Sequence, residues 1–397
     1  MNTGLLYLKS NNLIRESLDT QYQIITNNII SRSNNKINLV NDSQALNCDV
    51  LFVFVSGGGT ETIFKKKLDN FSGPVYLIAT NGNNSLAASM EILSYMNSKN
   101  SRCKIIHDIN NNFDKQIDEV LAIEETKDYL RKSKFARIGK PSDWLISSNV
   151  DADQLKRAVG TTLIDIPIDE LISEINKNFY EEDAYTEKFM ALDFNEDEKI
   201  KALYCYGALR RIIDKYNLDG LTVRCFDLLD TVKTTSCVAF SLLNAQGVFC
   251  SCEGDVPSLM SMATIAKLTS KPPFQANPSI INKDENSIVL AHCTIPLNMS
   301  DSVALDTHFE SGIGVAVKSE VPVGDATIFK CSGLLDKHFV SNATIEKNLN
   351  QYDLCRTQIK VTLEQSVNYF FERSIGNHHI VINGKYADLV NKFFEAL

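Results

Sequence analysis

The chain has 397 residues, a hydrophobic content of 44% and a formal net charge of −9. This length predicts two or three domains with sizeable cores. An acidic balance without a basic stripe argues against a nucleic acid partner, and no apolar run is long enough to span a membrane. No secretory signal opens the chain, and ten scattered cysteines without a CxxC pair predict reduced thiols in a cytoplasmic protein.

Strand-like and helix-like segments alternate over residues 1–132. The expected strands are 3–10, 37–40, 48–59, 74–80 and 103–109, and the expected helices are 15–32, 60–71, 84–99 and 111–133. Such alternation is typical of parallel strands joined by crossover helices. We therefore predict an N-terminal Rossmann-like α/β domain at 1–132.

A second α/β domain is expected at 133–295. It begins with "KFARIGKPSDWL", continues through a long polar helical region at 170–216, and ends near "GVFCSCEGD". From about residue 296 the chain becomes rich in strands, as in "GIGVAVKSEVPVGDATIFKCSG" and "QIKVTLE". The fold class is thus α/β, with two Rossmann-like domains followed by a mostly β, barrel-like domain at 296–397.

Three glycines at 57–59 follow an apolar strand and precede a helix. Backbone N–H groups at such a turn can hold an anion, with Gly58 and Thr60 as the candidate contacts. The stretch lacks both the Lys-Ser/Thr of a P-loop and the GxGxxG spacing. The alternative is a tight turn with Thr60 as N-cap and no ligand.

The turn Cys-Glu-Gly-Asp at 252–255 is the strongest candidate site. Open α/β sheets place ligands beyond the carboxyl ends of their strands, where Glu253 stands. Gly254 permits a sharp turn, and Asp255 is placed to cap the helix that begins at 256–257. Helix capping does not account for Glu253, because a carboxylate directly after an apolar run needs a partner such as a metal or a base.

Histidines follow in three later stretches. If the turn of a 274–292 hairpin is centred between Asp284 and Glu285, Asn277 lies opposite His292, whereas a slip by one brings Ala276 across instead. His308 and Glu310 would share one face of an extended strand. His378 and His379 begin a strand and point to opposite faces, one toward the core or a site and the other toward solvent.

The sequence resembles the L-fucose isomerase / L-arabinose isomerase superfamily in a short form. The resemblance rests on "GGGTE", "GKPSDWL", "CEGDVPSLM", "QANPS", "LAHCTIP", "THFESGIGVAV" and "GNHHIVINGKY", in that order. It implies two Rossmann-like domains, a C-terminal barrel, and aldose–ketose isomerisation through an enediol with a divalent metal, usually Mn²⁺. It also implies a homo-oligomer, a trimer or hexamer, in which a neighbour's first domain covers the site.

Site residues follow from the same resemblance. It implies Glu253 as metal ligand and base, Asp255 as a supporting catalytic group, and His292 and His379 as metal ligands. The second acidic ligand of the family is replaced here by Ala276 and Asn277, and Asn277 can offer only a neutral oxygen. The remaining substrate contacts are expected at Trp144, His308, Glu310, His378, Gly58 and Thr60.

Two alternatives stay open. The loss of the second acidic ligand favours a non-catalytic carbohydrate-binding or regulatory protein on the isomerase scaffold. An anion held at the glycine turn would instead indicate an enzyme for a phosphorylated or sulfonated sugar.

Overall fold

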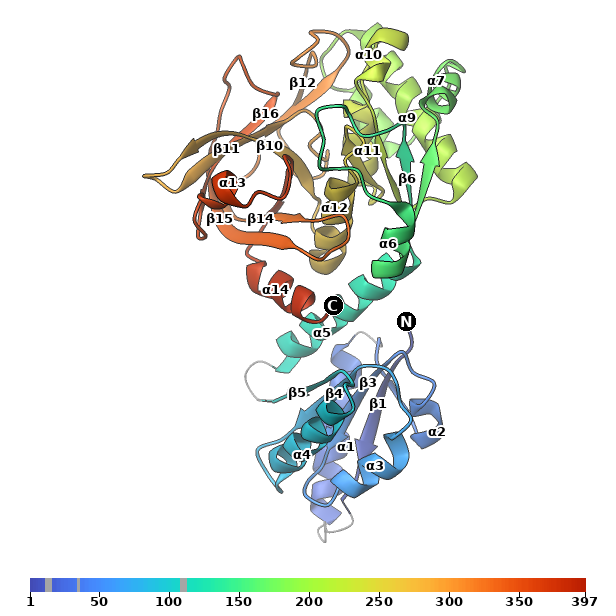
Figure 1. The fold of residues 1–397 in the computed structure, drawn as a ribbon, viewed down its shortest axis with the longest axis vertical. Coiled ribbons are helices and arrows are strands. Elements are labelled where there is room, and N and C mark those ends of the chain that lie inside the picture. The colour runs from blue at the N-terminus through green and yellow to red at the C-terminus, as the bar shows by residue number, and fades with distance from the viewer. Residues whose placement is uncertain (11–15, 34–35, 108–112) are drawn as a thin grey trace. The chain divides into compact units, whose positions relative to one another are not determined.

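Alternating apolar strands and helices build the chain, which a computed structural model describes for residues 1–10, 16–33, 36–107 and 113–397. The chain divides into two units, residues 1–125 and 126–397 (Figure 1). It is an α/β protein with parallel sheets and a closed antiparallel β-barrel of six strands.

The first unit contains a parallel sheet in the order β2-β1-β3-β4-β5. Its strands are β1 Thr3–Leu8, β2 Asn38–Leu39, β3 Val50–Val55, β4 Val75–Ala79 and β5 Cys103–Ile106. Its helices are α1 Glu16–Arg32, α2 Asp42–Ala45, α3 Glu61–Leu68 and α4 Ser85–Ser98, and α5 Phe113–Lys132 begins in it. The central strand β3 is buried throughout, as expected for a strand covered on both faces. Residues 15, 108–109 and 111–112 of the predicted elements lie outside the described residues.

A second parallel sheet, in the order β7-β6-β8-β9, opens the second unit. Its strands are β6 Lys134–Ile138, β7 Thr162–Ile166, β8 Gly220–Val223 and β9 Phe249–Cys252. Its helices are α6 Ala152–Ala158, α7 Ile168–Ile175, α8 Ala184–Met190, α9 Glu196–Tyr216, α10 Asp227–Thr231, α11 Cys237–Ala245 and α12 Val256–Thr269. The polar region predicted as helical over 170–216 is therefore three helices.

The barrel closes in the order β10-β11-β16-β15-β14-β17, and every neighbouring pair is antiparallel. Its strands are β10 Phe274–Asn282, β11 Ser287–His292, β14 Gly324–Cys331, β15 His338–Asn348, β16 Thr357–Leu363 and β17 His379–Asn383. A two-stranded sheet of β12 Val303–Asp306 and β13 Ala316–Ser319 accompanies it, with α13 Tyr369–Glu372 and α14 Ala387–Glu395.

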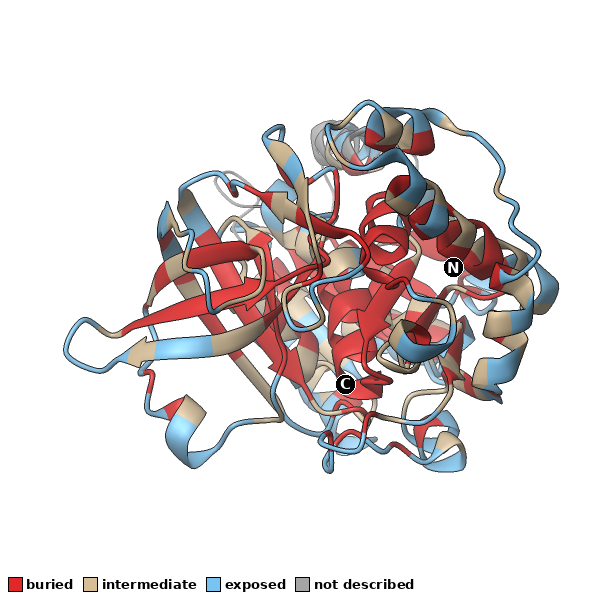
Figure 2. Ribbon diagram, turned by 90° about the horizontal axis from the view of Figure 1, so that it is seen from above, coloured by how far each residue is buried: buried red, intermediate tan, exposed pale blue. Residues whose placement is uncertain are grey.

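Barrel and sheet share one apolar core in the second unit. Residues of α9 and α11 belong to the same buried cluster as residues of β10, β11 and β16. We expected a domain boundary between 295 and 296, but β10 and β11, which precede it, already belong to the barrel. Burial is concentrated along the strands and central helices, whereas many of the connecting loops are exposed (Figure 2).

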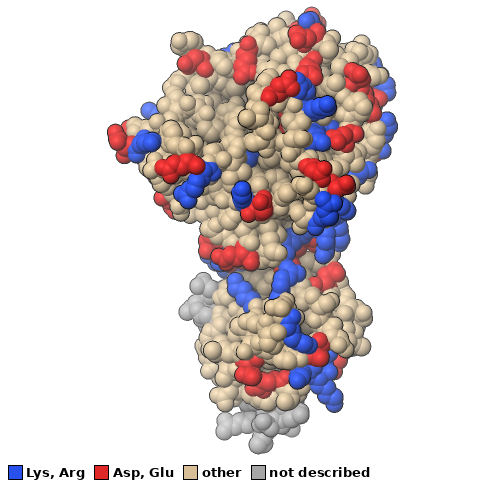
Figure 3. Space-filling view, viewed as in Figure 1, with Lys and Arg blue, Asp and Glu red and all other residues tan. Residues whose placement is uncertain are grey.

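Acidic and basic side chains are interspersed on the face shown in Figure 3. No helix within the described ranges is long and apolar enough to cross a bilayer.

The β10–β11 hairpin contains an irregularity that matters for the site. Near the turn, Ile281 faces Ile288, as the predicted register requires, but the register shifts between Pro278 and Ile280. The extra residue, Ser279, forms a bulge, so Asn277 lies opposite Ala291 rather than His292. The predicted register thus holds at the turn and fails beyond the bulge.

Candidate functional site

Three parallel strands end side by side where the candidate site lies. Strand β8 pairs with both β6 and β9, so the segments that follow these strands meet at one edge of the sheet. Trp144 lies in the segment after β6, Phe226 in the segment after β8, and Glu253 directly after β9. The Trp144 ring stands edge-on to Phe226 at a centroid distance of 5.0 Å, and its Nε1–H donates a 2.7 Å hydrogen bond to Glu253 Oε2.

Glu253 occupies a backbone conformation that non-glycine residues rarely adopt. Its φ is +67°, and φ of Gly254 is +71°. The turn is held because the Gly254 N–H donates to Val223 O and the Ser142 N–H donates to Glu253 O, both at 2.9 Å. Strain of this kind, of order 1–3 kcal/mol, persists where surrounding structure imposes it and is concentrated at functional sites.

Asp255 caps helix α12, as predicted, and also contacts the barrel. One of its carboxylate oxygens accepts the Ser258 N–H at 2.9 Å, and the other lies 2.8 Å from His378 Nδ1 and 3.6 Å from Lys330 Nζ. Burial alone would raise the pKa of Asp255, but the charge of Lys330 and the hydrogen bond from His378 hold it below its ordinary value. Asp255 is therefore a buried carboxylate between sheet and barrel.

Of the two adjacent histidines, His378 faces Glu253. Its Nε2 lies 3.8 Å from Glu253 Oε1 and has no hydrogen-bond partner within the described part of the chain. His292 stands edge-on to it at a ring-centroid distance of 5.6 Å.

The structure places His379, the expected metal ligand, on the other face of the strand. It pairs with Ala276, and its ring packs against Tyr369 and Phe370. Its Nε2 bonds to the Tyr369 hydroxyl at 3.1 Å and its Nδ1 to Asn377 O at 2.9 Å, so both nitrogens are engaged. Neither histidine is exposed, which corrects the expectation that one would face solvent.

His292 and Asn277 line the same pocket as Glu253 in spite of the register shift. The Nδ1 of His292 bonds to the Thr294 hydroxyl at 2.9 Å, and burial lowers the pKa of His292 well below its ordinary value. The Oδ1 of Asn277 is buried and has no hydrogen-bond partner among the described residues. A neutral imidazole and an unpaired amide oxygen therefore line the same pocket as the Glu253 carboxylate.

His308 and Glu310 also line this pocket, but not from a strand. Residues 307–312 form a turn between β12 and β13, so the expected shared strand face is wrong. His308 Nδ1 bonds to the Ser311 hydroxyl at 2.9 Å, and burial and the charge of Arg356 lower its pKa to about 4. Partial burial and the charge of Glu253 raise the pKa of Glu310.

The glycine turn of the first unit uses its candidate groups internally. The Gly58 N–H donates to Asn83 O at 2.9 Å, and the Thr60 hydroxyl donates to Gly57 O at 2.7 Å. Thr60 is the N-cap of α3 by position, but its side chain makes no capping bond. This geometry matches the tight-turn alternative, and a substrate contact at Gly58 or Thr60 stays a prediction.

Other lining residues escaped the sequence analysis. Phe226 follows β8, and the thiols of five cysteines from distant segments gather around the pocket: Cys225, Cys237, Cys252, Cys293 and Cys355. Lys330, on β14, contacts Asp255 from the barrel. An isolated lysine or cysteine carries no signal of its own, because only the tertiary structure brings it to the site.

The donor atoms fit a divalent cation in kind. Glu253 offers a carboxylate, His292 an imidazole, and the two unpartnered buried atoms, Asn277 Oδ1 and His378 Nε2, supply an oxygen and a nitrogen. The 3.8 Å between His378 Nε2 and Glu253 Oε1 is within the roughly 4 Å that two ligands of one ion can span. The fit is one of donor type only, because no three His, Cys, Asp or Glu side chains of the described residues are gathered closely enough to hold an ion.

Two curated proteins are similar to this chain, both named sulfoquinovose isomerase. One, from Alkalicoccus urumqiensis, is 18% identical over 226 residues, which is 54% of this chain and 51% of the relative. The other, from Clostridium sp. (strain MSTE9), is 27% identical over 214 residues, 51% of this chain and 48% of the relative. The chain thus spans about half the length of the curated relatives it matches. No protein-family model matches the chain.

Proposed function

We propose that this chain is an aldose–ketose sugar isomerase whose reaction takes place at Glu253. The observation that carries the proposal is a buried carboxylate in a left-handed turn at the carboxyl end of β9, with His378 facing it and His292 and Asn277 lining the same pocket. Similarity to two sulfoquinovose isomerases supports a sugar isomerase activity in general. The finer proposal, from the family resemblance, is a fucose- or arabinose-type sugar.

Glu253 is the group that moves the proton. Isomerisation transfers a hydrogen between C1 and C2 of the sugar through an enediol, and one carboxylate can remove it from one carbon and return it to the other. The Trp144 N–H holds Oε2, which leaves Oε1 on the side of His378. His292 and His308, both buried with lowered pKa, are neutral near pH 7 and can accept a hydroxyl proton.

A divalent cation, which we propose to be Mn²⁺, would be held by Glu253, Asn277, His292 and His378. When bound, it would polarise the carbonyl and the adjacent hydroxyl of the sugar and stabilise the enediolate. Asn277 contributes no charge where the family has an acid, so Glu253 supplies the anionic ligand of this set. The role of ligand that the resemblance assigns to His379 passes to His378 in this proposal.

The test is hydrogen exchange with solvent. The purified protein, supplied with Mn²⁺ in D₂O, is incubated with neutral aldoses and with a sulfonated hexose, and products are followed by NMR. We expect ketose formation from at least one sugar, with deuterium incorporated next to the carbonyl group. E253Q should lower the rate at least 100-fold, the scale on which general bases contribute.

E181Q, at an exposed glutamate, is the matched control and should keep the wild-type rate. Absence of turnover and of exchange with every sugar would reject the proposal. Thermal stabilisation by a sugar without turnover would indicate the carbohydrate-binding alternative instead.

A further inference from the structure

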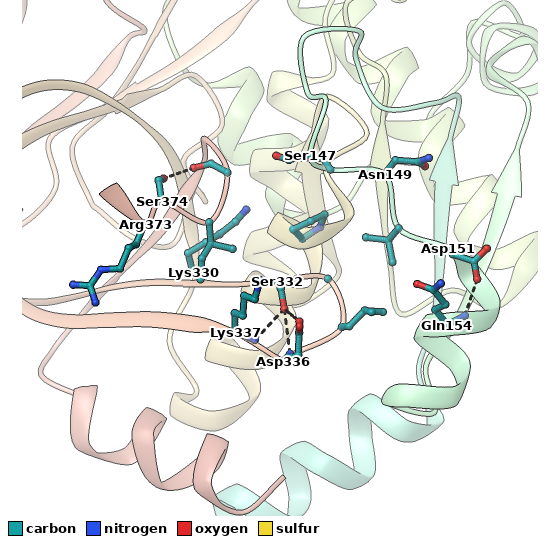
Figure 4. Close-up of a pocket in the computed structure, with 17 residues that line it drawn as sticks. Ser147, Asn149, Asp151, Gln154, Lys330, Ser332, Asp336, Lys337, Arg373 and Ser374 are labelled. Carbon is teal, nitrogen blue, oxygen red and sulfur yellow. Dashed lines mark hydrogen bonds between the residues drawn. The ribbon is translucent and has the colours of Figure 1, made fainter. Parts of the chain in front are cut away.

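Lys330 is a buried cation that the proposed chemistry does not use. It lies on β14 with 1% of its side chain exposed, next to a cavity of about 680 Å³ whose lining is shown in Figure 4. Its Nζ donates a 2.8 Å hydrogen bond to Ser258 Oγ and lies 3.6 Å from Asp255 Oδ2. A lysine ammonium buried this deeply needs such partners, because an unpaired charge in the interior is costly.

The hydrogen bonds around Lys330 run in one direction. An ammonium only donates, so the Ser258 hydroxyl accepts from Lys330 and turns its own hydrogen toward Asp255 Oδ2 at 2.6 Å. The same carboxylate oxygen lies 2.8 Å from His378 Nδ1. An ionised carboxylate only accepts, so Nδ1 carries a hydrogen, and Nε2 is the ring nitrogen that faces Glu253.

We infer that Lys330 is a positioning residue for the site. Through Ser258 and Asp255 it keeps a hydrogen of His378 on Nδ1 and fixes the orientation of the ring, and so keeps Nε2 beside Glu253. The expected effect on turnover rests on the proposed function. The inference adds to that function a residue, Lys330, that does not line the Glu253 pocket. Outer contacts of this kind set the orientation and basicity of a functional histidine.

The test compares K330M with K199M. Lys199 on α9 is the matched control, since it is also a buried lysine, 2% exposed. Its Nζ bonds to Met190 O and Leu192 O at the end of α8. We measure kcat, KM and Tm, and record the ring nitrogens of His378 by long-range ¹H–¹⁵N NMR on histidine-labelled protein. The chain has six histidines, and the His378 signal is identified by its loss in H378Q.

K330M should lower kcat at least tenfold with KM within twofold, and the ring-nitrogen signals of His378 should move from their wild-type positions. K199M should lower Tm and leave both kcat and the His378 signal as in the wild type. S258A interrupts the same contacts while keeping the ammonium, and serves if K330M does not fold; we expect the same change of the His378 signal.

A K330M or S258A protein with a wild-type His378 signal would overturn the inference, and so would wild-type kcat. If the wild-type protein has no isomerase activity, the proposed function fails, whereas the NMR comparison still decides the role of Lys330.

Discussion

His378 and His379 have opposite surroundings although they are adjacent in sequence. The first contacts Asp255 and faces Glu253, and the second lies among Tyr369, Phe370 and Phe339. The alternation of side chains along a strand explains this division. Replacing each histidine by the same side chain should therefore affect a different property of the protein.

We predict that H378L loses activity and H379L loses stability. H378L should lower kcat at least 100-fold, because it removes the nitrogen next to Glu253. H379L keeps the volume but removes the nitrogen that accepts the Tyr369 hydroxyl hydrogen, although that hydroxyl still accepts the Ile375 N–H. An unpaired buried donor costs about 1–3 kcal/mol. Turnover and urea unfolding of both variants check this, and an inactive but stable H379L would contradict it.

The indole of Trp144 is half exposed, so its hydrogen bond to Glu253 is partly screened by water. We expect W144F to lower kcat/KM about fivefold, the equivalent of about 1 kcal/mol for one such bond. Steady-state kinetics give the value. Y352F, at an aromatic residue that is 91% exposed, is the control and should be silent; an unchanged W144F would show that Glu253 does not need the donor.

At the scale of elements, the turn between β9 and α12 determines where Glu253 points. A Cβ at Gly254 would lie 2.6 Å from Lys140 O and 2.7 Å from Pro141 Cα, so the turn and the loop after β6 pack directly on each other. Gly247 has a comparable φ of +80°, yet apart from its own chain neighbours no described atom lies within 4 Å of its Cβ position.

This pair of glycines gives a matched prediction. G247A should cost only the backbone strain, about 1–2 kcal/mol. G254A should cost more than G247A and should also lower kcat, because the clash displaces either Glu253 or the loop that carries Trp144. Urea unfolding and turnover measure both effects, and equal destabilisation of the two variants would contradict the close packing.

The hairpin of β10 and β11 shows how far the residue pattern predicts pairing. The turn at Asp284 and Glu285 was predicted correctly, and so was the pairing next to it. The bulge at Ser279 was not, because an unpaired residue in a strand leaves the apolar pattern nearly unchanged. Asn277 and His292 are therefore not the predicted cross-strand partners, but both line the same pocket.

At the scale of the whole molecule, the lining of the candidate pocket comes from the second unit, where sheet and barrel share a core. A ligand that binds only the folded state raises stability by an amount set by its concentration over Kd, about 2.7 kcal/mol at a hundredfold excess. We therefore predict that Mn²⁺ raises the Tm of the wild-type protein by several degrees and that a chelator reverses the change.

The double variant E253Q/H292L removes two of the proposed ligands and should show no such rise. Differential scanning calorimetry with and without Mn²⁺ is the measurement. A rise of equal size in the double variant would mean that the cation binds elsewhere.

The sequence by itself determined the alternation of strands and helices, the sharp turn at Glu253–Gly254 and the cap at Asp255, because periodicity, glycine and capping chemistry act over a few neighbouring residues. Only the tertiary structure decided that His378 rather than His379 faces Glu253, that Trp144 bonds to that carboxylate, and that Lys330 stands behind Asp255. These contacts join residues about 70 to 125 positions apart. The contacts of His378 and Lys330 depend on the closure of the barrel, and that of Trp144 depends on the pairing of β6 and β9 with β8. Neither leaves a local pattern in the chain.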